Sequence, residues 1–116
     1  MRRQGDLAEA EAHYRRNLVA WQEQGHLPAV AHSVECLAFL AIAGGRHGHA
    51  ARLLGAATEA RELHSSVSTN PVEIAERSQA LEQLAAALGE AERDRLMAEG
   101  RRLSLEDAVL LALGRA

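Results

Sequence analysis

Glycines divide this sequence into segments whose apolar residues recur every three or four positions. The apolar positions of the first segment are Leu7, Ala10, Tyr14, Leu18 and Trp21. This spacing places all of them on one face of an α-helix. Because each later segment repeats the pattern, we expect an all-α fold.

The stop signals predict six helices, over about residues 5–24, 28–43, 47–63, 71–88, 90–100 and from 104 onward. Gly44 or Gly45 is expected to supply the left-handed stop of the second helix. Ser104 and Asp107 have the Ser-x-x-acid spacing of a helix start. A turn-rich interval, residues 64–71, separates repeat-like helices (5–64) from C-terminal helices (71–114) that pack on them within one domain.

The composition agrees with a helical globular domain. Hydrophobic residues make up 47% of the 116 residues and charged residues 25%, which is the balance of a chain that folds. Aromatic residues contribute only 3%, so the core must be built from Ala, Leu and Val. A core of these residues favours helices that approach closely, whereas a sheet would want more Val, Ile, Thr and aromatic residues.

Charge and hydropathy exclude several classes of function. The net charge is −3, and the arginine pairs are dispersed, so we expect no direct nucleic-acid binding. No apolar run approaches the roughly 20 residues of a membrane span, and the N-terminus lacks a signal-peptide core. The lone Cys36 cannot form an internal disulfide, and we therefore predict a cytoplasmic protein.

No constellation of residues points to catalysis. The stretch GGRHG at 44–48 has no lysine and follows a predicted helix, unlike a phosphate loop. His32 and Cys36 share a helical face, but no third or fourth zinc ligand is visible and nothing orients His32 as a base. We therefore expect neither an enzyme nor a cofactor or metal site.

Two segments repeat one another. Aligning Gly5 with Gly45 brings Ala10 onto Ala50 and Tyr14 onto Leu54. A small residue followed by a large one at this spacing after a glycine turn resembles the second helix of a tetratricopeptide repeat, although the period is 40 rather than 34. The resemblance implies antiparallel hairpins in a right-handed superhelix.

Longer stretches, among them AARLLGAATEARELHS and SLEDAVLLAL, resemble the C-terminal helical-repeat region of bacterial LuxR- and AfsR-like transcriptional regulators and signalling ATPases. The phosphate loop and DNA-binding motif of those proteins have no counterpart here. The resemblance implies a non-enzymatic protein–protein interaction module of bacterial transcriptional control or signalling. The alternative is a small-molecule sensor with a pocket among the second, third and fourth helices.

Two surfaces are candidates for binding. On the second helix, the residues expected to face the concave groove are His32, Glu35, Phe39 and Ile42. Phe39 and Ile42 there either pack against a neighbouring helix or subunit, or bind a ligand or peptide. On the first helix, the candidates for self-association are Leu7, Tyr14, Leu18 and Trp21. Because only four residues precede Gly5, this helix is expected to lack its repeat partner, and a two-fold homodimer would cover it.

Overall fold

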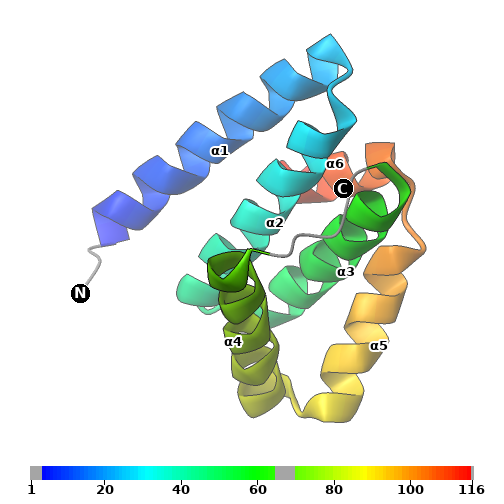
Figure 1. The fold of residues 1–116 in the computed structure, drawn as a ribbon. Helices are drawn as coiled ribbons and strands as arrows, with labels where there is room; N and C mark the ends of the chain where they lie inside the picture. The colour runs from blue at the N-terminus through cyan, green and yellow to red at the C-terminus, as the bar shows by residue number, and fades with distance from the viewer. Residues whose placement is uncertain (1–3, 65–69, 116) are drawn as a thin grey trace.

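The computed structural model describes residues 4–64 and 70–115, which form six α-helices and no strand. The helices are α1 (Gln4–Gln24), α2 (Leu27–Ala43), α3 (His47–His64), α4 (Pro71–Leu88), α5 (Glu90–Arg101) and α6 (Leu105–Ala112), as Figure 1 shows. The all-α class is therefore confirmed, and the described helix ends lie within one or two residues of those predicted. None of these helices has the length and apolarity needed to cross a bilayer.

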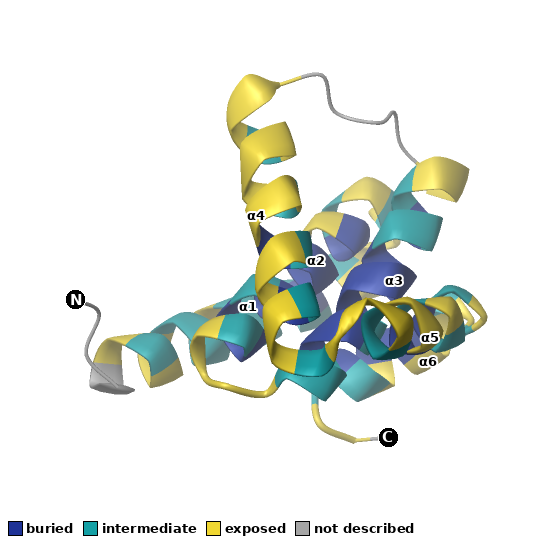
Figure 2. Cartoon of the chain, turned by 90° about the horizontal axis from the view of Figure 1, so that it is seen from below, coloured by how far each residue is buried: buried dark blue, intermediate teal, exposed yellow. Residues whose placement is uncertain are grey.

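Helix α3 is the centre of the molecule. It packs against α2 on one side and α5 on the other, with α6 also in contact. Much of α3 is coloured as buried in Figure 2. Eight of its 18 residues are buried, and Leu53 and Leu54 are almost fully enclosed. The apolar residues of α3, spaced three and four apart in the sequence, thus face the core.

The corner between α2 and α3 is a left-handed glycine stop. Gly45 has a φ of +79°, and its amide donates to the carbonyl of Ile42 at 3.0 Å. The Arg46 amide donates to the carbonyl of Ala41 at 2.8 Å, which completes a Schellman motif. Gly25, with a φ of +70°, ends α1 in the same way. The predicted role of the glycines at 44 and 45 is confirmed for Gly45.

Side chains cap the starts of three helices. The Ser104 hydroxyl accepts a hydrogen bond from the Asp107 amide at 3.1 Å, as the Ser-x-x-acid spacing predicts. Asn70 caps α4 through its side-chain oxygen. The sequence did not indicate the third cap, in which Nδ1 of His26 accepts from the Ala29 amide at 3.2 Å.

Helices α3 and α5 cross with their backbones in contact. A Cβ atom added to Gly55 would overlap the backbone of Met97, and one added to Gly100 would overlap the carbonyl oxygen of Arg52. Gly100 was expected to end its helix, but α5 continues to Arg101 and Gly100 is buried. Its role is to permit this close approach, because no other residue lacks a Cβ.

Candidate functional site

An open groove runs between α2 and α4. It contains two hollows, of about 490 Å³ and about 190 Å³, that share Phe39, Ile42 and Gln83. The larger hollow is completed by Ala43, His47, Ala86 and Ala87, and the smaller one by Glu76, Gln79 and Ala80. We call this combined surface the α2–α4 groove.

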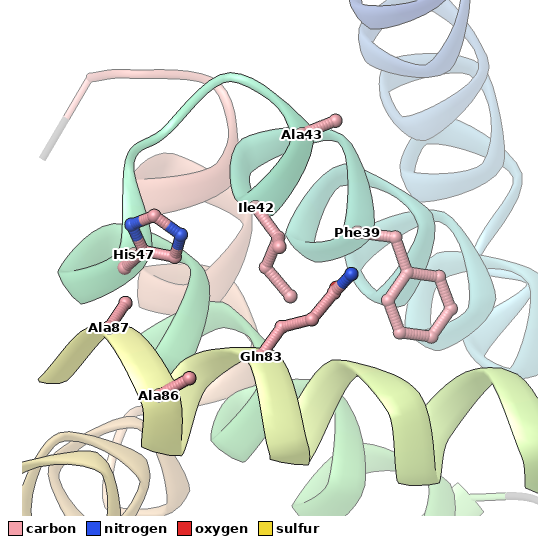
Figure 3. A pocket seen from close by; sticks show the side chains of 7 residues that line it. All are labelled: Phe39, Ile42, Ala43, His47, Gln83, Ala86 and Ala87. Carbon is pink, nitrogen blue, oxygen red and sulfur yellow. The ribbon is translucent and has the colours of Figure 1, made fainter. Parts of the chain in front are cut away.

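Figure 3 shows how the lining residues of the larger hollow lie. Gln83 rises from α4 toward α2 between Ile42 and Phe39, and His47, the first residue of α3, lies above Ala87 at one end. The walls are therefore mostly hydrocarbon, with one amide and one imidazole as polar groups. This is the composition of a site that buries an apolar side chain and orients it with a few hydrogen bonds.

The hollows exist because the facing side chains are small. Phe39 and Ile42 lie three residues apart on α2 and so project from one face. Opposite them, Ala80, Ala86 and Ala87 of α4 have no atoms beyond Cβ. Because these side chains do not fill the space between the two helices, a groove remains between α2 and α4.

Glu35 lies beneath this surface rather than on it. Its residue exposure is 5%, and Nη2 of Arg77 on α4 donates to its Oε2 at 2.6 Å. Nη2 of Arg61 on α3 lies 3.3 Å from its Oε1. One carboxylate thus binds two guanidinium groups and joins α2, α3 and α4. A buried charge is tolerated when it is paired and hydrogen-bonded in this way.

His32 and Cys36 lie one turn apart on α2 but form no nucleophilic pair. Nη2 of Arg61 lies 3.1 Å from Nδ1 of the exposed His32, so Nδ1 is the acceptor and carries no proton. Nε2 then carries the proton and faces the Cys36 sulfur at 3.5 Å. Burial raises the pKa of Cys36 to about 11, and the thiol form predominates at neutral pH. Because a nucleophilic cysteine requires the thiolate, this arrangement does not favour covalent chemistry.

Only two of the four predicted groove residues thus line the groove. Phe39 and Ile42 line both hollows and are half-buried, with α4 beside them. Glu35 is covered by the two arginines, and His32 is held by Arg61 outside the hollows. Sequence reasoning allowed a pocket among the second, third and fourth helices, but it named neither the lining residues of α4 nor His47. The alanine run at 85–87 was the available signal, since small residues on a helix facing Phe39 and Ile42 leave space.

The four α1 residues predicted for self-association also differ in their exposure. Leu18 is fully enclosed by its own chain, where a second copy cannot reach it. Leu7, Tyr14 and Trp21 are half-buried against α2 and the core. An ion pair at 2.7 Å between Glu11 and Arg46 also ties α1 to the α2–α3 corner. These three partly exposed residues remain the candidates for contact with another chain.

The chain is all-helical and carries a surface groove whose larger hollow is mostly apolar, while Glu76, Gln79 and Gln83 make half of the lining residues of the smaller one polar. Among the residues that the structure describes, no three His, Cys, Asp or Glu side chains are grouped so that they could hold a metal ion. No family model matches the sequence, and no curated protein or solved structure is significantly similar to it. The function is therefore inferred from the residues that line the groove.

Proposed function

We propose that this chain is a non-enzymatic interaction module that binds a segment of another protein along the α2–α4 groove. The observation that carries the proposal is that Phe39 and Ile42 stay partly exposed and line two adjoining hollows. Adjoining hollows that share apolar walls accept successive side chains of a bound helix or extended segment. His47 and Gln83 in the larger hollow, and Glu76 and Gln79 in the smaller one, supply the polar contacts that fix its orientation.

The wider context is part of the same proposal. We infer a tetratricopeptide-like order of hairpins, with α2 and α4 neighbours on the groove side and α3 and α5 behind them. Support comes from the register, since Ala50 and Leu54 are both fully buried at the positions that the repeat alignment assigns to the core. The resemblance to LuxR- and AfsR-like regulators supports a role in bacterial transcriptional control or signalling within the cytoplasm.

Site-specific crosslinking tests the binding surface. A photo-crosslinking residue is placed at Phe39, and in a control chain at Ala20, which is exposed on α1. We expect a discrete protein adduct at Phe39 alone. Ala87→Trp should fill the larger hollow and lower the adduct yield at least about tenfold, whereas Ala75→Trp, exposed on α4 outside the hollows, should leave it unchanged. Equal yields from both tryptophan variants would refute the groove as the binding surface.

A small-molecule sensor is the second candidate. The larger hollow lies among α2, α3 and α4, and its volume of about 490 Å³ falls within the usual range of ligand pockets. A ligand present at 100 times its dissociation constant should add about 2.7 kcal/mol of stability. A thermal-shift screen measures this gain, and a hit that Ala87→Trp abolishes would favour the sensor over the protein-binding module.

A further inference from the structure

A second concave surface lies where α3, α5 and α6 meet. It is a hollow of about 380 Å³ that shares no lining residue with the α2–α4 groove. Four charged side chains and two leucines line it: Arg52 of α3, Glu99 of α5, Arg102 and Leu103 of the turn that follows, and Asp107 and Leu111 of α6. We call it the charged hollow. Its volume lies near the lower end of the range of ligand pockets, which suits a small molecule.

The charges of this hollow are not neutralised by direct hydrogen bonds across it. Nε of Arg52 lies 3.9 Å from Oε1 of Glu99, which is beyond hydrogen-bond distance, and the other oxygen of Glu99 accepts from Arg95 at 3.0 Å. Among the residues that the structure describes, the exposed side chains of Arg102 and Asp107 take part in no hydrogen bond or ion pair. One guanidinium and one carboxylate are therefore available to a ligand.

The turn between α5 and α6 fixes the backbone at both of these residues. Arg102 ends α5, and its amide donates to the carbonyl of Glu99 at 3.2 Å. Asp107 lies in the first turn of α6, and its amide donates to the Ser104 hydroxyl at 3.1 Å. A ligand between the two residues would have to order only their side chains, which lowers the entropic cost of binding.

The balance of charges selects the kind of ligand. Two guanidiniums and two carboxylates give the lining no net charge. A simple anion would meet the carboxylates and a simple cation the guanidiniums, and such like-charge contacts are unfavourable. A zwitterion places its carboxylate on a guanidinium and its ammonium on a carboxylate, and both contacts are charge-assisted hydrogen bonds. Leu103 and Leu111, both half-buried, add an apolar wall.

We propose that the charged hollow binds a free α-amino acid with an aliphatic side chain. Arg102 binds its carboxylate, Asp107 binds its ammonium group, and the two leucines contact its side chain. The bound amino acid would join α6 to α5 and α3. This inference goes beyond the proposed function, because it concerns a different surface and a different class of ligand.

Calorimetric titration of the unmodified chain with L-leucine is the first test. The compound 4-methylpentanoate is leucine without its ammonium group, and 3-methylbutylamine is leucine without its carboxylate. Each should bind at least about tenfold more weakly than leucine, because each loses a hydrogen bond between charged groups. Equal affinity for leucine and either analogue, or no saturable binding of leucine up to about 10 mM, would overturn the proposal.

Two substitutions test which residue holds which group. Asp107→Asn should remove the preference for leucine over 4-methylpentanoate, and Arg102→Gln should remove the preference over 3-methylbutylamine. Each preference is a ratio measured on one variant, so a loss of stability does not imitate it. The control variants Glu106→Gln and Arg16→Gln, whose residues do not line the hollow, should bind leucine as the wild type does. Wild-type preferences in both test variants would overturn the proposal.

The Ala87→Trp variant separates this site from the α2–α4 groove. It should bind leucine as the wild type does, because no residue of α4 lines the charged hollow. Loss of leucine binding in Ala87→Trp would place the ligand in the groove and overturn the proposal. Crosslinking at Phe39 involves no amino-acid ligand, so either proposal can fail while the other stands.

Discussion

A single added methyl group at the α3–α5 crossing should destabilise this fold. At Gly100 a Cβ atom would overlap the carbonyl oxygen of Arg52 and lie 3.0 Å from the amide nitrogen of Ala56. At Gly55 it would overlap the carbonyl oxygen of Met97 and lie 2.8 Å from its carbonyl carbon. All of these atoms are backbone, so no side-chain rotation relieves the overlap and the helices must separate.

The magnitude follows from two opposing effects. Overpacking a well-packed contact costs about 1–3 kcal/mol, and a backbone clash belongs at the upper end of that range. Replacing glycine by alanine within a helix gains up to about 1 kcal/mol. We therefore expect Gly55→Ala and Gly100→Ala each to lower the free energy of unfolding by about 2 kcal/mol.

Gly48 provides the matched control on the same central helix. A Cβ atom there would meet only Cδ1 of Leu96, at 3.7 Å, which is an ordinary contact. Gly48→Ala should be neutral or stabilising by up to about 1 kcal/mol. Urea unfolding followed by circular dichroism measures all three variants. Stability of Gly100→Ala equal to that of Gly48→Ala would refute the close crossing.

Further predictions concern the core, two titratable groups and the oligomeric state. Leu54→Ala should cost about 2–5 kcal/mol in urea unfolding because Leu54 is fully buried, while His49→Ala should cost less than about 1 kcal/mol. Burial, and then the charge of Arg46, lower the pKa of His49, so the unfolded chain binds more protons than the folded chain and the wild type loses stability as the pH falls through 6.5, the ordinary pKa of histidine. His49→Ala lacks this loss, so its stability relative to the wild type should rise over the same pH range. With a pKa of about 11, Cys36 should react with iodoacetamide about a hundredfold more slowly near pH 8 than free cysteine, and faster as pH rises. Light scattering should show a dimer, and a 12.5 kDa species at high micromolar concentration would contradict it.

Helix positions were predictable because their signals are local. The three- and four-residue spacing, the glycine stops and the Ser104 cap act within a few residues, and the described helices follow them closely. The burial and ion pairing of Glu35 were not predictable in this way. Its two partners are 26 and 42 residues further along the chain, on α3 and α4, so only the tertiary packing decides that it is buried and paired.

Gly100 shows a second kind of limit. A glycine near the end of a helical pattern predicts a stop, since a left-handed residue there requires no Cβ. The same absence of Cβ also permits another backbone to approach, and sequence cannot distinguish the two uses without knowing what lies opposite. The left-handed glycines found at the other corners, Gly25, Gly45 and Gly89, do act as stops or turns.

Small residues have opposite effects on the two sides of the molecule. Behind α3, glycines on both helices meet backbone to backbone, and α5 closes on α3 without a gap. On the groove side, alanines of α4 face the larger Phe39 and Ile42 of α2, which hold the helices apart and leave the hollows open. The groove is therefore a consequence of where the small residues lie as well as of how many there are.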